Sequence, residues 1–239
     1  MSGAPRGAAP ATAQPWAKPG RIRICPSILS ADFARLGEEI ARVERAGADF
    51  LHVDIMDGQF VPNLTFGPMV VEAIRRLTRL PLDVHLMIVE PLRFLDAFAT
   101  AGASHLTVHV ETVPDPMAAA RAIRARGLKA GLSVKPGTPI DRLLAALSAI
   151  DVALVMTVEP GAGGQTFLPG SPERIARVRA AIDAGRLDCL LEVDGGITEQ
   201  TAAVAARAGA DTFVAGHSIF HASDPEGALR RIREVLSRP

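Results

Sequence analysis

Short apolar runs rich in β-branched residues alternate with amphipathic segments along the chain from residue 21 onward. The apolar runs predict eight strands, at 22–29, 49–55, 82–88, 105–110, 129–134, 152–158, 189–194 and 212–215. Segments with helical periodicity lie between them, as at 36–46 and 171–182. Eight strands in strict alternation with eight helices are typical of an α/β fold, the single (β/α)8 TIM barrel, and this is the fold that we predict.

An open doubly wound sheet, which alternates in the same way, is the second possibility. That fold places a glycine fingerprint after its first strand, whereas the first predicted strand here runs into Cys25-Pro-Ser-Ile-Leu-Ser. The glycines cluster instead after the sixth, seventh and eighth strands, where barrels often bind phosphate. Three predicted helix-to-strand turns, at 46–48, 101–103 and 208–210, read Ala-Gly-Ala, with a glycine suited to a helix C-cap.

Composition narrows the class of protein. Hydrophobic residues are 48% of the chain, yet no apolar run approaches the ~20 residues of a membrane helix. Basic and acidic residues balance at 26 each, which argues against a nucleic-acid-binding surface. Cys25 and Cys189 are isolated in apolar segments, so we expect two buried free thiols in a protein of a reducing compartment. Residues 1–20 have no acidic residue and no signal-peptide core, so we expect a disordered leader before a catalytic domain at 21–239 of a cytoplasmic protein.

Polar residues recur at alternate positions inside two predicted strands. His52 and Asp54 are two residues apart, so they share one face of their strand, and His85 lies in the next strand along the chain. Asp194 ends the seventh predicted strand. The carboxyl ends of barrel strands meet at the mouth where barrel enzymes have their active sites, so we expect these side chains to lie together there.

Two imidazoles and two carboxylates inside a barrel are costly unless a partner offsets them. A divalent cation would balance the two carboxylates, which otherwise repel each other. We therefore expect one divalent metal ion per chain, held by His52, Asp54, His85 and Asp194; Zn, Fe, Mn and Co all suit this set. An ion chelated by a ketone and the neighbouring hydroxyl would acidify the carbon between them and stabilise an enediolate.

Glycine-rich turns follow the last three predicted strands, at 160–165, 194–196 and 215–218. Glycines let backbone N–H groups close on an anion. A single glycine pair after a strand is commonly just a tight turn, but three such loops in succession favour a phosphate site.

Methionines and serines near the strand ends have two interpretations each. Met56, Met87 and Met156 are either core filler or an apolar wall that excludes water from a reactive intermediate. Ser27 and Ser30, after the first strand, are either hydrogen-bond partners of a substrate or helix N-caps, and Ser30 is the better placed to cap.

Taken together, these segments resemble the ribulose-phosphate 3-epimerase family, in order and without large gaps from about residue 22 to the C-terminus. The motifs that carry the resemblance are Pro26-Ser-Ile-Leu-Ser-Ala-Asp-Phe, His52-Val-Asp-Ile-Met-Asp-Gly, Phe60-Val-Pro-Asn, Asp83-Val-His-Leu-Met, Met156-Thr-Val-Glu-Pro-Gly, Gly163-Gly-Gln, Glu192-Val-Asp-Gly-Gly-Ile and Gly216-His-Ser-Ile-Phe.

The resemblance implies a barrel of the ribulose-phosphate-binding type that interconverts D-ribulose 5-phosphate and D-xylulose 5-phosphate, in the pentose phosphate pathway or the Calvin cycle. It implies that Asp54 and Asp194 transfer the proton at C3 through a 2,3-enediolate, besides binding the metal. The residues implied to contact this phosphosugar are Ser27, Met56, His85, Met87, Met156, Gly161, Ala162, Gly163, Gly164, Gly195, Gly196, Gly216 and His217. We also expect a homo-oligomer that binds neither nucleic acid nor membrane.

Three positions depart from the family's pattern. Ala162 replaces the usual Phe of the phosphate loop, His217 stands where a smaller Ser-like or Asn-like residue is common, and Gln59 stands where His or Arg is frequent. None of these changes removes an expected ligand or proton carrier.

Other functions on the same barrel make different demands on the sequence. Phosphosugar decarboxylases carry a strand-end lysine, but Met56 occupies that position here. Schiff-base aldolase chemistry would need Lys135, after the fifth strand. A non-catalytic binding barrel would not need both carboxylates. The nearest alternative is a 3-epimerase of a six-carbon ketose phosphate such as D-allulose 6-phosphate.

Overall fold

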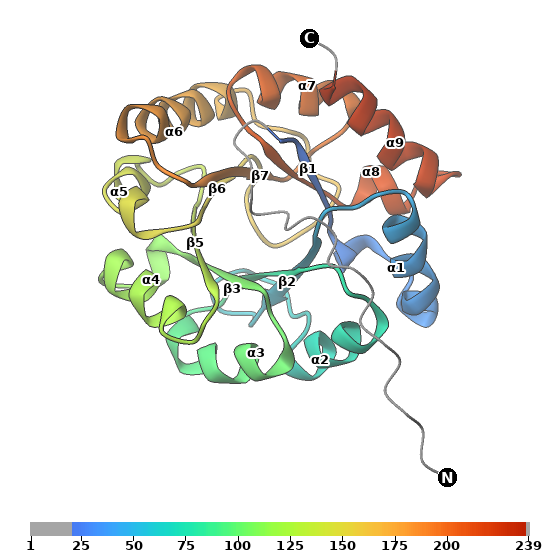
Figure 1. Cartoon of the computed structure of the whole chain (residues 1–239), viewed down its shortest axis with the longest axis horizontal. Coiled ribbons are helices and arrows are strands. Elements are labelled where there is room, and N and C mark those ends of the chain that lie inside the picture. The colour runs from blue at the N-terminus through green and yellow to red at the C-terminus, as the bar shows by residue number, and fades with distance from the viewer. Residues whose placement is uncertain (1–20, 238–239) are drawn as a thin grey trace.

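The computed structural model describes residues 21–237, so the leader expected at 1–20 lies outside the described residues. Its eight strands form a ring with the helices outside it (Figure 1). The strands are β1 (Arg23–Pro26), β2 (Leu51–Met56), β3 (Leu82–Met87), β4 (His105–His109), β5 (Lys129–Val134), β6 (Val152–Met156), β7 (Leu190–Asp194) and β8 (Thr212–Ala215). The predicted (β/α)8 TIM barrel is confirmed.

Parallel pairing runs around the barrel in the order β1-β8-β7-β6-β5-β4-β3-β2. Two contacts close the ring between the first and last members of that row. Ser27, directly after β1, forms an isolated parallel bridge with His52, and the Asp49 N–H donates to the Ile24 carbonyl at 3.0 Å. The closure therefore brings the end of β1 beside the first residues of β2.

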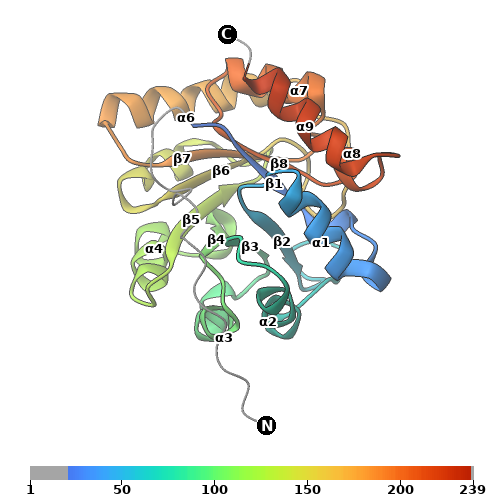
Figure 2. The ribbon, with the colours of Figure 1, turned by 45° about the vertical axis from the view of Figure 1, so that its right-hand side comes forward.

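The helices cover the outer face of the sheet, as the turned view also shows (Figure 2). They are α1 (Leu36–Arg45), α2 (Pro68–Leu77), α3 (Leu95–Ala101), α4 (Pro116–Arg124), α5 (Asp141–Leu144), α6 (Ser171–Gly185), α7 (Glu199–Arg207), α8 (His217–Phe220) and α9 (Pro225–Leu236). The strict alternation expected from the sequence is broken after β8, because both α8 and α9 follow that strand.

Aliphatic side chains fill the space between strands and helices. Residues such as Val53, Leu86 and Leu132 are fully buried in one core cluster. The expected glycine C-caps are also present, since Gly47, Gly102 and Gly209 in the three Ala-Gly-Ala turns all have φ between 92° and 110°. These turns return the chain from each helix to the amino end of the next strand and leave the other mouth free for longer loops.

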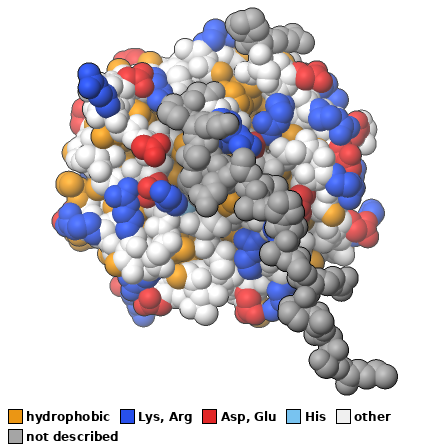
Figure 3. Space-filling model, viewed as in Figure 1, with side chains coloured by type: hydrophobic (Ala, Val, Ile, Leu, Met, Phe, Trp, Pro, Cys, Tyr) orange, Lys and Arg blue, Asp and Glu red, His pale blue; other side chains and the backbone are white. Residues whose placement is uncertain are grey.

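Charged side chains of both signs are interspersed over the face seen in Figure 3, as the balance of 26 basic and 26 acidic residues leads one to expect. Within residues 21–237, no helix combines the length and the apolar character that crossing a lipid bilayer requires.

Candidate active site

The four residues expected to bind a metal come together at the carboxyl ends of the strands. The parallel register of β2 and β3 sets Asp54 beside His85. Asp194, the last residue of β7, reaches the same place from another part of the ring. His52, Asp54, His85 and Asp194 each offer one ligand atom, and these atoms all lie within 4.8 Å of one another.

Short contacts connect these four side chains. The Oδ1 atom of Asp54 lies 3.2 Å from His52 Nε2 and 3.3 Å from His85 Nδ1. The Oδ2 atom of Asp194 lies 3.8 Å from the same His85 nitrogen and 4.0 Å from the same His52 nitrogen. Each imidazole therefore turns one particular nitrogen toward the space between the two carboxylates.

The pKa values of the two carboxylates are shifted in opposite directions. Burial acts to raise the pKa of Asp54, but the neighbouring His52 and the hydrogen bonds from His52 and His85 outweigh burial and lower it. Burial and then the Asp54 charge raise the pKa of Asp194 to about 6. An acid/base pair in an enzyme requires two neighbouring groups whose environments give them different pKa values.

The donor set fits a divalent cation. Two carboxylate oxygens and two imidazole nitrogens converge, and a cation among them would offset the repulsion between Asp54 and Asp194. Asp54 keeps a further contact, because its Oδ2 accepts a hydrogen bond from the Ser27 hydroxyl at 2.5 Å. The arrangement of nitrogen and oxygen ligands is open to Zn, Fe, Mn or Co.

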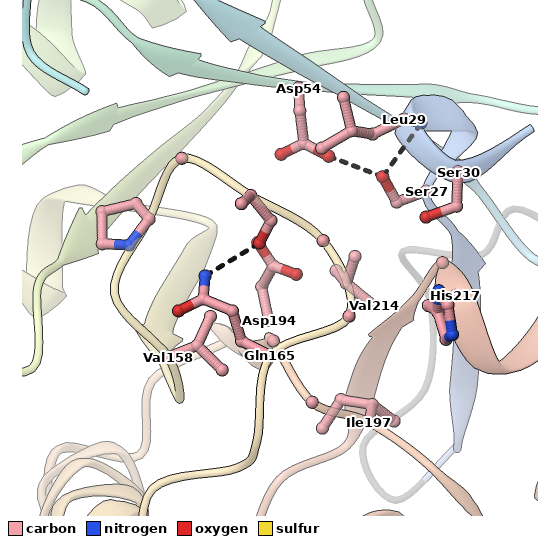
Figure 4. Close-up of a pocket in the computed structure, with 18 of the residues that line it drawn as sticks. Ser27, Leu29, Ser30, Asp54, Val158, Gln165, Asp194, Ile197, Val214 and His217 are labelled. Carbon is pink, nitrogen blue, oxygen red and sulfur yellow. Dashed lines mark hydrogen bonds between the residues drawn. The ribbon is translucent and has the colours of Figure 1, made fainter. Parts of the chain in front are cut away.

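A pocket opens directly above the cluster of His52, Asp54, His85 and Asp194, and all three glycine turns line it. Figure 4 shows Asp54 with Ser27 on one side of this pocket, Asp194 and Gln165 near its middle, and His217 at its edge. The lining includes twelve of the thirteen residues implied to contact substrate, namely Ser27, Met56, Met87, Met156, Gly161, Ala162, Gly163, Gly164, Gly195, Gly196, Gly216 and His217. His85, the thirteenth, is buried beneath the pocket, in contact with Asp54.

The glycine turns pack against one another so closely that side chains would not fit. Gly196 has φ +66°, and a Cβ there would lie 2.5 Å from the Phe167 backbone nitrogen. A Cβ on Gly216 would lie 2.7 Å from Ser30 Oγ. Loops from β6, β7 and β8 thus meet over the end of β1, which leaves their backbones close to anything bound there.

The loop after β6, which carries Ala162, is held by hydrogen bonds from Gln165. The Gln165 side-chain amide donates to the carbonyl of Glu159 at 2.6 Å and to that of Ala162 at 2.8 Å. His217 is exposed, and its ring lies 4.2 Å from that of His221. Both departures from the family's pattern therefore lie at the rim of the pocket.

The expectation for the two serines after β1 is wrong in its ranking. Ser30 was the better candidate for a cap, yet Ser27 is the N-cap of the short 3-10 turn Ile28–Ser30, since its hydroxyl accepts from the Leu29 N–H. The same Ser27 hydroxyl binds Asp54, whereas Ser30 lines the pocket. The strand was expected to run to residue 29, but β1 ends at Pro26, so the cap lies earlier in the chain, at Ser27.

Three methionines form part of the pocket wall. Met56 and Met87 are buried in a small cluster with Val61, and Met156 is buried beside Val158. These side chains fill space in the core and also line the pocket, whereas the exclusion of water from a reactive intermediate stays a prediction.

Lysine chemistry has no support among residues 21–237, because no lysine lines the pocket. Lys135 Nζ lies 3.6 Å from the centroid of the Phe60 ring and donates to the Phe60 carbonyl at 3.3 Å. The lysine that Schiff-base chemistry would need is therefore engaged by a neighbouring loop.

Sequence reasoning missed further buried polar groups around the four residues. Asp83, His105, His109 and Glu192 are at most 1% exposed, and they point into the barrel. Burial and the neighbouring Asp83 charge raise the pKa of Glu192, so this group favours its neutral form. The alternation that placed His52 and Asp54 on one face also applies to His105 and His109 in β4, so the signal was present.

Comparison with known proteins gives a consistent match over most of the chain. Residues 23–220 match the model of the ribulose-phosphate 3 epimerase family. The chain is 52% identical over 210 residues to "Ribulose-phosphate 3-epimerase" of Mycobacterium tuberculosis, covering 88% of this chain and 91% of that protein. It is 48% identical over 213 residues to the protein of the same name in Bacillus subtilis, covering 89% and 98% of the two chains.

Solved structures with low identity share the fold. KGPDC from Streptococcus mutans in complex with D-R5P has a TM-score of 0.68 at 19% identity, covering 91% of this chain and 98% of that one. 3-Hexulose-6-phosphate synthase from Salmonella typhimurium has a TM-score of 0.65 at 21% identity, covering 90% and 98%. The sequence matches go further than these likenesses of fold: the chain belongs to the ribulose-phosphate 3-epimerase family.

Proposed function

We propose that this protein is a metal-dependent epimerase that interconverts D-ribulose 5-phosphate and D-xylulose 5-phosphate. The observation that carries the proposal is the cluster of Asp54, Asp194, His52 and His85, whose ligand atoms lie within 4.8 Å of one another beneath a pocket lined by three glycine turns. The names of the relatives at 48% and 52% identity agree with this activity.

The two aspartates divide the proton transfer between them. Inversion at C3 removes a proton from one face of the carbon and returns a proton to the other, so one group on each face is needed. Asp54 comes from β2 and Asp194 from β7, which lie in different parts of the ring. One carboxylate acts as the base while the other, protonated, acts as the acid, and the roles exchange with the direction of the reaction.

His52 and His85, together with both aspartates, would hold one divalent ion. Such an ion, when bound, supplies a positive charge that favours the 2,3-enediolate over the ketose. Ser27 orients the Asp54 carboxylate through its hydrogen bond, and Met56, Met87 and Met156 exclude water from the reacting carbon.

The three glycine turns would bind the substrate phosphate. Gly161–Gly164, Gly195, Gly196, Gly216 and His217 all line the pocket, so their backbone N–H groups can surround an anion bound there. Binding energy from a phosphate remote from C3 helps to position the reacting carbon.

Turnover measurements with and without metal test this proposal. Exhaustive chelation should abolish the epimerisation of D-ribulose 5-phosphate, and metal analysis should find about one ion per chain. Full activity in verified metal-free protein would contradict the metal's role. Unphosphorylated D-ribulose should be a far poorer substrate, and an equal kcat/KM for the two sugars would contradict the phosphate site.

The substrate could be a five-carbon or a six-carbon ketose phosphate, and turnover of the two sugars distinguishes them. A 3-epimerase of D-allulose 6-phosphate would use the same aspartates and the same phosphate loops. We propose the five-carbon substrate because the named relatives are ribulose-phosphate epimerases. A higher kcat/KM for D-allulose 6-phosphate than for D-ribulose 5-phosphate would reverse this choice.

Three expectations about the whole protein belong to the same proposal. We propose a cytoplasmic homo-oligomer whose partner is a phosphosugar rather than nucleic acid, with residues 1–20 as a leader and residues 21–239 as the catalytic domain. The isolated, buried Cys25 and Cys189 support the cytoplasmic location, and the balanced charge of the chain argues against nucleic acid as a partner.

A further inference from the structure

The imidazole of His52 has a partner on each of its nitrogens. Its Nε2 faces Asp54 and the metal-binding cluster, whereas its Nδ1 lies 2.5 Å from Asp83 Oδ2. The register of β2 and β3 pairs His52 with Asp83, so backbone geometry sets this contact. Asp83 is fully buried, and its other oxygen lies 2.5 Å from His105 Nε2.

The second imidazole of the cluster, His85, is held through a longer chain. Its Nδ1 faces Asp54, and its Nε2 lies 2.8 Å from His109 Nε2. The other nitrogen of His109 lies 3.2 Å from Glu111 Oε2. Glu111 is itself fixed, since its Oε1 accepts from the Lys135 backbone N–H at 2.9 Å.

If both imidazoles bind a cation, these contacts determine which ring nitrogen of each histidine carries the proton. A ligating nitrogen must present a lone pair, so the single proton of each neutral ring sits on the other nitrogen. His52 then donates from Nδ1 to Asp83, and His85 donates from Nε2 to His109. His109 can accept only if its own proton is on Nδ1, from which it donates to Glu111.

We propose that Asp83 and the pair His109–Glu111 are positioning residues that fix the tautomers of the two histidine ligands. His52 is thereby made a ligand through Nε2, and His85 a ligand through Nδ1. Carboxylates behind metal-bound histidines orient the ring and raise its basicity, and their loss typically weakens metal binding about 10- to 100-fold. This inference rests on the proposed metal site and adds to it the groups that prepare its ligands.

The first test reads the tautomers directly, by NMR of the Zn²⁺-loaded full chain with ¹⁵N-labelled histidine. We expect His52 to be bound through Nε2 with a slowly exchanging Nδ1–H, and His85 to be bound through Nδ1 with a slowly exchanging Nε2–H. Coordination of His52 through Nδ1, or of His85 through Nε2, overturns the proposal, and neither result depends on activity.

The second test measures Co²⁺ affinity by competition with a chelator in Asp83→Asn and Glu111→Gln. Both oxygens of each carboxylate face a nitrogen neighbour, so an amide must turn its NH₂ group toward one of them. We expect the Kd for Co²⁺ to rise about 10- to 100-fold in each variant. Glu72→Gln is the matched control, because Glu72 is exposed on α2, where its carboxylate accepts a hydrogen bond from Arg76, so the Kd of this variant should equal that of the unmodified protein.

The outcomes separate this inference from the metal site on which it rests. An unmodified protein that binds neither Co²⁺ nor Zn²⁺ contradicts the metal site itself. An unmodified protein that binds Co²⁺, with an unchanged Kd in a folded Asp83→Asn or Glu111→Gln variant or an equal loss in Glu72→Gln, contradicts only the positioning role. If Asp83→Asn does not fold, Glu111→Gln and the tautomers of the unmodified protein still decide.

Discussion

Two aspartates in one pocket differ in acidity because their neighbours differ. Asp54 sits between two imidazoles and the Ser27 hydroxyl, all of which favour its charged form. Asp194 lies farther from both rings, and burial, together with the Asp54 charge, raises its pKa to about 6. Identical side chains can thus serve as a ready base and a ready acid in the same pocket.

The two cysteines provide a prediction about single residues. Burial raises the pKa of the Cys25 thiol and raises that of Cys189 to about 12. Only the thiolate reacts with disulfide reagents, so both thiols should be inert toward 5,5′-dithiobis(2-nitrobenzoic acid) in the native protein at pH 8. Both should react after denaturation, and rapid labelling of either one in the folded protein would contradict the described burial.

Individual residues also show where sequence reasoning ends. His52, Asp54, His85 and Asp194 were predictable, because period-two alternation and the rule that barrel strand ends meet at one mouth are enough to gather them. The contact between His52 and Asp83 was not predictable, because it depends on the register between β2 and β3. Register follows from the packing of the whole barrel, which local patterns do not contain.

At the scale of loops and helices, the glycine turn after β7 carries a prediction. Gly196→Val should displace the turn, because Gly196 has φ +66° and a Cβ would lie 2.5 Å from the Phe167 nitrogen and 2.9 Å from the Gln165 carbonyl oxygen. A shift of about 1 Å in a positioning loop can cost about 100-fold, so kcat/KM for the phosphorylated substrate should fall by that order.

Gly170→Ala is the matched control for this loop variant. Gly170 precedes α6 with φ −77°, and a Cβ there would meet nothing within 4 Å. We expect its kcat/KM to match that of the unmodified protein. Equal activity of Gly196→Val and Gly170→Ala would show that the turn after β7 does not position substrate.

Elements were predictable where their pattern is long and regular. The segment 171–182 was expected to be helical and forms most of α6, and the strand at 129–134 has the expected bounds. The connection between β5 and β6 is different, because α5 has only four residues and a 3-10 turn follows it at Leu147–Ala149. So short a helix derives its stability from tertiary packing rather than from its own periodicity.

For the molecule as a whole, Asp49 joins the two ends of the barrel. Its Oδ1 accepts from Arg21 at 2.7 Å, and its Oδ2 accepts from the Ile24 N–H at 3.0 Å and from Arg233 of α9 at 2.6 Å. The Asp49 side chain is 4% exposed. Asp49→Asn should lower the free energy of unfolding by about 1.5–3 kcal/mol, the usual contribution of hydrogen bonds to a charged group, as measured by urea denaturation.

A surface ion pair supplies the control for that measurement. Asp96 accepts from Arg126 through two hydrogen bonds, but its side chain is 81% exposed. Solvent screens such a pair, so Asp96→Asn should change the free energy of unfolding by only about 0–1 kcal/mol. A larger loss in Asp96→Asn than in Asp49→Asn would contradict the role given to Asp49 in closing the barrel.

The proposed reaction depends on single residues, on loops and on the closure of the barrel. Strand register gathers the residues, the loops after β6, β7 and β8 form the pocket, and barrel closure brings Ser27 to Asp54. In the proposed mechanism, Asp54 and Asp194 act on opposite faces of C3. A two-base inversion returns a proton from solvent rather than the one that was removed.

The most direct measurement follows hydrogen at C3 during epimerisation of D-ribulose 5-phosphate in deuterated water at low conversion. We expect one deuterium at C3 of the D-xylulose 5-phosphate formed, while the recovered D-ribulose 5-phosphate is still largely unlabelled. Asp54→Asn and Asp194→Asn variants that retain metal should each lose several powers of ten in rate, at ~1.4 kcal/mol per power. Product that keeps the substrate's own hydrogen at C3, or normal turnover in either variant, would contradict the two-aspartate mechanism.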